Sequence, residues 1–244
     1  MNCQPKQNNQ VYNWTKNKQS CLLCDEPADT MQPLCSACEA ELPWLGGHCA
    51  ICALPLPGEE LTCGQCQKRP PPFTRVEAAW RYAFPLDSLI TRFKHQRQWP
   101  LGRLLAGLLS QHLQHAFAEG LPRPDLLLPV PLGRKRLRSR GFNQARMLAD
   151  WLGQELQLAV QDNWLHRPGE GAHQQELDAA ARRRNLRNAF ALTESTEAAG
   201  RHIALIDDVL TTGATAATLA QLLLKAGAAR VDVYCLARTP KPGD

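Results

Sequence analysis

The chain has 244 residues, which is long enough for one or two domains with one sizeable core. Apolar residues make up 44% and charged residues 21%, as in ordinary globular proteins, and this excludes a wholly disordered chain. The formal net charge of +5 is unevenly distributed: residues 1–72 contain five Lys or Arg against seven Asp or Glu, and residues 73–244 contain 23 against 16. The basic character therefore belongs to the second part of the chain.

The sequence predicts neither a membrane span nor a secretory signal. The longest apolar runs, such as residues 126–132, fall short of the roughly 20 residues that a spanning helix needs. The first ten residues, MNCQPKQNNQ, lack the apolar segment of a signal peptide. Residues 1–20 contain nine Asn or Gln and are predicted to form a flexible tail. We therefore expect a cytoplasmic protein without a transmembrane segment.

Eight of the ten cysteines form four C-x-x-C pairs that repeat every 14 residues. Two such pairs supply the four thiolates of a tetrahedral zinc site. Disulfides do not persist in a reducing cytosol, and a redox site would use a single pair. We therefore predict two structural Zn²⁺ ions, with sequential and cross-braced pairing of the C-x-x-C units both open. The predicted ligands are Cys21, Cys24, Cys35, Cys38, Cys49, Cys52, Cys63 and Cys66.

A stiff linker at residues 69–73 (RPPPF) divides the chain. Residues 21–72 are predicted to form a double zinc ribbon with this linker, and residues 73–244 a second domain. In the second domain, strand and helix patterns alternate, which predicts an α/β fold with a mainly parallel sheet and flanking helices. Strands are expected at 76–82, 126–130, 203–206 and 231–236, and helices at 101–113, 142–156 and 219–226.

The most informative segment is HIALIDDVLTTGATAAT, residues 202–218. An apolar strand leads into two adjacent carboxylates, then into a loop and a helix whose N-terminal N–H groups form an anion cradle. Carboxylates suit ribose hydroxyls, and in open α/β sheets ligands bind at this edge. The alternative is a capped helix after a buried strand. We favour a sugar-phosphate site formed by Asp207, Asp208, Thr211, Thr212, Gly213, Ala214 and Thr215.

A basic segment follows directly on the strand that ends at Val130. Its guanidinium groups suit pyrophosphate, and the same charges would attract single-stranded DNA. The residues that follow, Phe142, Asn143 and Gln144, offer an aromatic face and two amides for a stacked base; a solvated basic loop is the alternative. The candidate anion contacts are Arg134, Lys135, Arg136, Arg138 and Arg140.

Two further basic features have two interpretations each. Lys94 stands at a helix end, where it could reach a phosphate or simply complement the helix dipole. A second cluster could bind an anion or form an exposed helix face. It consists of Arg182, Arg183, Arg184 and Arg187.

The segment IALIDDVLTTGAT resembles the phosphoribosyl-pyrophosphate (PRPP) motif of type I phosphoribosyltransferases. Together with the C-x-x-C pairs, LITRFK (89–94), LPVPLGRKRLRSRGFNQA (128–145) and RRRNLRNAF (182–190), it resembles the ComF family, also called GntX, over about residues 21–238. The resemblance implies a type I phosphoribosyltransferase-like parallel sheet with flanking helices and a small hood. It also implies that Asp207 and Asp208 contact the ribose 2′- and 3′-hydroxyls, that residues 211–215 contact the 5′-phosphate, and that Mg²⁺ enters with the pyrophosphate.

The ComF resemblance implies a part in competence, in the uptake or use of single-stranded DNA, beside DNA-translocation machinery at the inner membrane. PRPP or a related sugar phosphate is the implied ligand. Three functions stay open. The first is phosphoribosyl transfer, in which a nitrogen nucleophile attacks C1 of the ribose as pyrophosphate leaves. The others are a non-catalytic module that binds single-stranded DNA or a partner, and a regulator that senses PRPP.

Overall fold

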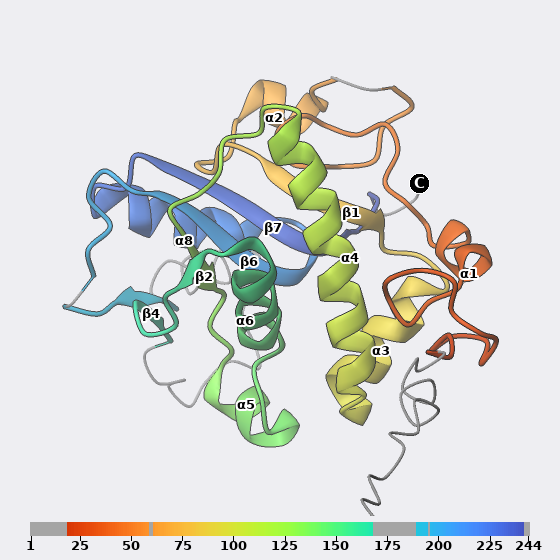
Figure 1. Cartoon of the computed structure of the whole chain (residues 1–244). Coiled ribbons are helices and arrows are strands. Elements are labelled where there is room, and N and C mark those ends of the chain that lie inside the picture. Colours follow the sequence, from red (N-terminus) through yellow and green to blue (C-terminus); the bar gives the residue numbers. More distant parts are fainter. Residues whose placement is uncertain (1–18, 59–60, 168–188, 195, 242–244) are drawn as a thin grey trace, which may run out of the picture. The chain divides into compact units, whose positions relative to one another are not determined.

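The computed structural model describes residues 19–58, 61–167, 189–194 and 196–241 (Figure 1). The chain forms two compact units, Met1–Glu41 and Leu42–Asp244. This boundary falls inside the stretch that the sequence groups as one double ribbon, so the two cysteine clusters belong to different units. The division at residues 20 and 72 stays a prediction, and the expected N-terminal tail lies almost wholly outside the described residues.

The smaller unit has little regular structure besides the helix α1 (Ser36–Ala40). Its chain folds back on itself through an isolated bridge between Ser20 and Pro27 and a hydrogen bond from Leu22 N–H to Pro33 O of 3.0 Å. Asp29 accepts hydrogen bonds from the N–H and hydroxyl of Ser36, both of 2.8 Å, and these bonds lower the pKa of its carboxyl. A unit this small has too little apolar core to fold alone, so we expect it to depend on its metal.

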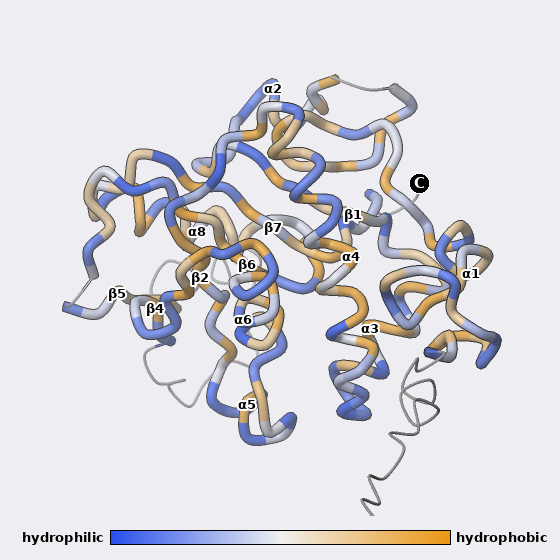
Figure 2. Tube along the Cα trace, viewed as in Figure 1, coloured by the Kyte–Doolittle hydropathy of each residue, from blue (hydrophilic) through white to orange (hydrophobic). Residues whose placement is uncertain are grey.

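The larger unit is built on a five-stranded parallel sheet in the order β1-β7-β6-β2-β3. Its central strands are almost continuously buried, as expected of a parallel sheet covered on both faces. Figure 2 shows the hydrophobic run of β2 and β6. The predicted parallel sheet is therefore confirmed, with β6 and β7 longer than expected and a short fifth strand, β3, that the sequence did not predict. The strands are β1 (Val76–Arg81), β2 (Leu126–Pro129), β3 (Ala159–Val160), β6 (His202–Leu210) and β7 (Arg230–Arg238).

One face of the sheet is covered by helices α3 (Leu86–Gln96), α4 (Trp99–Ala118) and α6 (Gln144–Leu156). Helix α4 packs on β1 and β7, and α6 packs on β2 and β6. The side chains confirm this face: the ring of Tyr234 in β7 lies 6.4 Å from that of Phe117 in α4.

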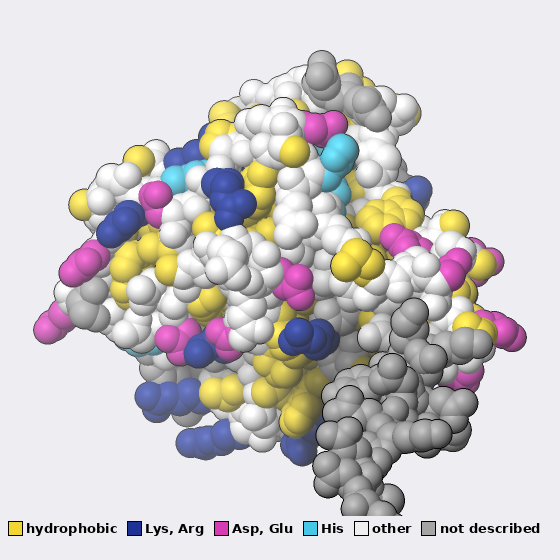
Figure 3. Space-filling view, viewed as in Figure 1, with side chains coloured by type: hydrophobic (Ala, Val, Ile, Leu, Met, Phe, Trp, Pro, Cys, Tyr) yellow, Lys and Arg dark blue, Asp and Glu magenta, His cyan; other side chains and the backbone are white. Residues whose placement is uncertain are grey.

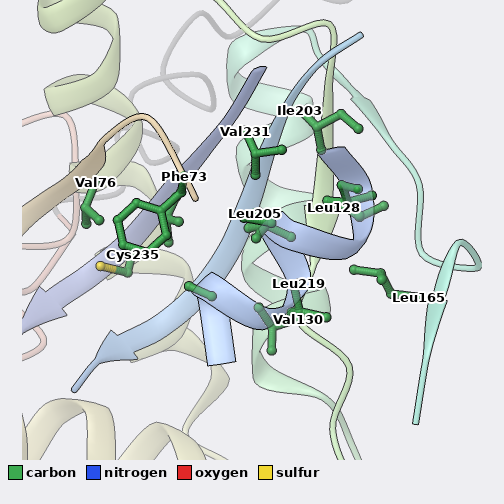
Figure 4. Packing of buried hydrophobic residues seen from close by; sticks show 14 of the residues in the cluster. Phe73, Val76, Leu128, Val130, Leu165, Ile203, Leu205, Leu219, Val231 and Cys235 are labelled. Atoms are coloured by element: carbon green, nitrogen blue, oxygen red, sulfur yellow. The ribbon is translucent and has the colours of Figure 1, made fainter. Parts of the chain in front are cut away.

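The opposite face is covered by helix α8 (Ala214–Lys225). Leu219 of α8 belongs to one buried cluster with Leu205 of β6 and Val231 of β7 (Figure 4). Gly227 lies just beyond this helix with a φ of 92°, a conformation that favours glycine after a helix end. The expected helix is thus confirmed, and its N-terminus directly follows the end of β6.

Three smaller elements complete the larger unit. Helix α2 (Gly64–Lys68) belongs to the second cysteine cluster, and β4 (Leu165–His166) pairs antiparallel with β5 (Ala191–Leu192). The basic segment forms a helix, α5 (Arg134–Arg140), and not the solvated loop that was one interpretation of its sequence. Among the described residues, no helix is long and apolar enough to cross a membrane.

Candidate functional site

The eight cysteines of the C-x-x-C pairs form two separate clusters. In each cluster the four Sγ atoms lie within 4.8 Å of one another, and the first pair joins the second while the third joins the fourth. The pairing is therefore sequential and not cross-braced, two possibilities that the spacing of the cysteines left open. Four soft thiolates fit a closed, tetrahedral Zn²⁺ site of the structural kind. The clusters are Cys21, Cys24, Cys35, Cys38 and Cys49, Cys52, Cys63, Cys66.

Backbone N–H groups point at the sulfur atoms of both clusters. Cys35 and Cys63 occupy matching positions, because each caps a short helix and accepts a hydrogen bond of 3.5 Å from the N–H of the cysteine three residues later. Cys49 Sγ also accepts a 3.3 Å bond from Cys63 N–H. Such bonds favour the thiolate that the metal requires.

The threonine-glycine loop joins β6 to α8. Thr211 and Thr212 are exposed, and Gly213 has a φ of 75° as the residue before the first turn of the helix. The Ala214 N–H donates to Thr212 Oγ1 over 3.3 Å. The first N–H groups of an α-helix have no acceptor within the helix, so this turn presents donors to an anion.

Replacing Gly213 by alanine tests the loop geometry. At a φ of 75° a Cβ costs about 1–2 kcal/mol, so Gly213→Ala is expected to lower the free energy of unfolding by that amount and to weaken phosphate-ligand binding. Gly200→Ala is the matched control: its φ is 71°, and no atom lies within 4 Å of the added Cβ. Urea unfolding and calorimetric titration of both variants should show similar losses of stability, with weaker binding only for Gly213→Ala. Equal affinities would contradict the assignment.

The two carboxylates lie within β6, before its end at Leu210. Asp208 is only 4% exposed, and its Oδ2 lies 2.6 Å from Nζ of Lys94. Its other oxygen accepts a hydrogen bond of 2.7 Å from Val209 N–H, while Asp207 Oδ1 accepts one of 2.9 Å from Asp208 N–H. Lys94 comes from the last turn of α3, so the fold brings a cation from a distant helix onto the acidic pair.

Burial shifts the ionisation of this group. It raises the pKa of Asp207 to about 6, against the opposing effect of the Lys94 charge. Burial also lowers the pKa of Lys94 to about 8, with Asp207 raising it and Arg140 and Arg136 lowering it further. The charge of Lys94 is therefore attracted by the acids of β6 and repelled by the arginines of α5. A ligand with hydroxyls could donate to the carboxylates, and an anionic group on the same ligand could bind the cations.

Helix α5 presents most of its basic side chains to solvent. Arg134, Lys135, Arg136 and Arg138 are exposed, and Figure 3 shows dark blue side chains along the lower edge, where Figure 1 places α5. Arg140 is partly buried and its Nη1 donates to Gln144 Oε1 over 2.9 Å. Burial, followed by the charge of Arg136, lowers the pKa of Arg140.

The side-chain amides of Asn143 and Gln144, which follow α5, form hydrogen bonds within the protein. Asn143 Oδ1 accepts from Ala145 N–H over 3.1 Å and caps α6, while its Nδ2 donates to Val130 O over 3.1 Å. Gln144 is buried against Arg140. Both amides therefore have partners inside the protein, and their use for a stacked base stays a prediction. The Phe142 ring packs 5.7 Å from Phe93.

One predicted basic cluster lies outside the described residues, and one buried arginine near the loop was not predicted. The second basic cluster, residues 182–187, lies outside the described residues. Arg238, which the sequence analysis did not single out, donates to the Thr211 carbonyl at the start of the loop. Its only sequence signal is an arginine at the end of an otherwise apolar strand, RVDVYCLAR.

Comparison with known proteins adds three findings. Residues 18–67 match the model of the double zinc ribbon domain. The chain is 40% identical to DNA utilization protein YhgH of Escherichia coli O157:H7, over 90% of this chain and 96% of that one, and 37% identical to competence protein F of Haemophilus influenzae, over 84% and 90%. A solved purine phosphoribosyltransferase of Pyrococcus horikoshii has 18% identity and a TM-score of 0.33, covering 57% of this chain and 74% of that chain.

Proposed function

The chain belongs to the family of DNA utilization protein YhgH and competence protein F, and from this premise we propose that its larger unit binds PRPP or a closely related sugar phosphate during the uptake or use of DNA. The observation that carries the proposal is the group formed by Lys94, Asp207 and Asp208 beside the loop that begins at Thr211.

The donors and acceptors of this group match the parts of PRPP in order along β6 and α8. Carboxylate oxygens of Asp207 and Asp208 accept from ribose hydroxyls. The first-turn N–H groups of α8 and the hydroxyls of Thr211, Thr212 and Thr215 donate to the 5′-phosphate, with Gly213 and Ala214 allowing a close approach. Lys94 and the arginines of α5 complement the pyrophosphate.

A magnesium ion fits the same place. Carboxylate and phosphate oxygens are the hard ligands that Mg²⁺ prefers, and Asp207 and Asp208 supply the protein's share. When bound, the ion would supply positive charge that complements the pyrophosphate. In the free protein, Nζ of Lys94 lies 2.6 Å from Asp208 Oδ2 and neutralises part of the charge of the acidic pair.

Titration of Asp207 tests this function. Its pKa of about 6 in the free protein means that the carboxylate is half-ionised near pH 6 and ionised above it. PRPP with Mg²⁺ requires the ionised form, so binding should lower this pKa, and affinity should rise with pH through that window. Above about pH 8 Lys94 loses its proton and the affinity should fall again.

Carboxyl carbon shifts followed by NMR measure the Asp207 titration directly, separately from the titration of the ligand's own phosphates. The Asp207→Asn variant assigns the resonance. A titration midpoint near 6 that moves down by one unit or more with PRPP and Mg²⁺ supports the proposal. A midpoint that PRPP leaves unchanged contradicts it.

A second candidate function rests on α5. Its exposed residues Arg134, Lys135, Arg136 and Arg138 form a surface that would attract the phosphates of single-stranded DNA, with an affinity that weakens steeply as salt rises. The half-exposed Trp99, whose ring lies 6.4 Å from Phe142, offers an apolar face for a base. In this function the protein holds DNA and performs no chemistry.

A further inference from the structure

Arg238 is a buried cation at the end of β7. Its residue is 7% exposed, and in the sheet register it is paired with Arg81 of β1 on one side and Leu210 of β6 on the other. Its guanidinium therefore sits where β6 passes into the threonine-glycine loop. A guanidinium has five N–H donors in a rigid fork, so it can hold several acceptors at fixed positions.

Main-chain carbonyls from two functional elements receive these donors. Nε donates to Cys52 O over 2.9 Å, and Cys52 is a ligand of the second cysteine cluster. Nη1 donates to Leu210 O over 3.1 Å and to Thr211 O. The Arg238 side chain therefore connects the backbone of the predicted zinc ligand Cys52 to Thr211, the first residue of the threonine-glycine loop.

The second cysteine cluster also joins the core through a backbone hydrogen bond and apolar packing. Val76 N–H donates to Ile51 O over 2.9 Å, which fixes the Cys49–Cys52 turn to the start of β1. Cys52 packs against the core cluster that contains Phe73. The Phe73 ring in turn lies 3.8 Å from the position that a Cβ on Gly213 would take. The direct connection from the second cysteine cluster to the threonine-glycine loop therefore runs through Arg238 to Thr211, and Phe73 of the shared core lies beside Gly213.

From these contacts we propose that zinc at Cys49, Cys52, Cys63 and Cys66 and sugar phosphate at the loop stabilise each other's binding, with Arg238 as the positioning residue between them. The inference rests on the proposed function. Loss of the metal loosens the Cys52 carbonyl and so removes the anchor of the Arg238 Nε, while Nη1 keeps its bonds to Leu210 O and Thr239 O. The guanidinium then positions Thr211 less firmly. By linkage, a ligand that orders the loop must also retain the zinc.

Zinc loss from the full-length protein tests the coupling. A zinc-selective chelator is added in excess, and release is followed by a colorimetric indicator with and without PRPP and Mg²⁺. The phase that survives in Cys35→Ser, which lacks the first site, reports the second. We expect PRPP to slow this phase at least fivefold. In Arg238→Met the phase should be faster, PRPP should no longer slow it, and PRPP affinity should fall about tenfold.

Arg230→Met is the matched control. Arg230 lies at the other end of the same strand and binds the buried Asp232, with Nη2 to Oδ2 at 3.0 Å. It should destabilise the fold while leaving PRPP's effect on zinc loss intact. Arg238→Lys keeps the charge and not the fork, so it should restore little of the coupling.

The outcomes separate the two proposals. PRPP that binds the wild-type protein by calorimetry without slowing zinc loss overturns the coupling and leaves the proposed function standing. Equal behaviour of Arg238→Met and Arg230→Met also overturns it, because that result assigns Arg238 to stability alone. A folded wild-type protein that does not bind PRPP overturns the proposed function and this inference with it.

Discussion

The Asp208→Asn variant is expected to bind PRPP with Mg²⁺ at least about 100-fold more weakly than the wild-type protein. Asparagine offers one acceptor oxygen and no charge, and its amide hydrogens face the ammonium of Lys94, now 2.6 Å from Oδ2. Hydrogen bonds to a charged group contribute about 1.5–3 kcal/mol each, and loss of two corresponds to a factor of about 100 or more. Isothermal titration calorimetry measures the loss.

Asp150→Asn is the control for this substitution. Asp150 also pairs with a cation, since Arg146 Nε lies 2.8 Å from its Oδ2, but the pair lies on the surface of α6. PRPP affinity should stay within twofold of the wild-type value. Affinity for single-stranded DNA, measured by fluorescence anisotropy, should be unchanged in both variants, because α5 retains its charges. If Asp208→Asn lost DNA affinity as strongly as PRPP affinity, the two ligands would share one site and the assignment would be wrong.

The second large effect concerns the metal. Cys63→Ser is expected to reduce the bound zinc from two ions to one and to lower the main thermal unfolding midpoint by roughly 10 °C or more. The second cluster is part of the larger unit, where Ala53 and Cys52 pack with its core. A structural zinc site contributes several kcal/mol or more to folding, and 1 kcal/mol corresponds to about 2–4 °C in a unit of this size.

Cys35→Ser provides the matched comparison. Cys35 has the same place in the first cluster, as the cap of α1 and the acceptor of a 3.5 Å bond from Cys38 N–H. Because it belongs to the smaller unit, we expect the same loss of one zinc with a main midpoint shifted by no more than about 2 °C. Calorimetry with zinc analysis by mass spectrometry measures both effects. Equal shifts in the two variants would contradict separate roles for the two clusters.

Local patterns predicted much of this molecule. The 14-residue repeat of C-x-x-C pairs identified all eight residues of the two clusters, because each pair needs only its own tight turn and one partner pair. The alternation of apolar runs and helical stripes located the parallel sheet and its main helices, since each element buries a face that its own sequence encodes. The same apolar pattern placed Asp207 and Asp208 on a strand of this sheet, and their contact with a ligand stays a prediction.

Contacts between residues far apart in the sequence could not be predicted from these local patterns. The pairing of Lys94 with Asp208 depends on where α3 lies on the sheet, and a lysine at a helix end has no local mark of it. The bonds from Arg238 to Cys52 and Thr211 join three distant segments. The basic segment, for which a solvated loop was one interpretation, forms the helix α5 and ends at Gly141, whose φ of 82° suits a helix terminus.

Calorimetric titration of the zinc-loaded wild-type protein with PRPP in the presence of Mg²⁺ tests the central claim most directly. The arrangement of Lys94, Asp207 and Asp208 beside the loop at Thr211 predicts saturable binding of one PRPP per chain near pH 7, between the ionisation of Asp207 at about 6 and that of Lys94 at about 8. An absence of binding by protein that retains two zinc ions and a cooperative unfolding transition would contradict it.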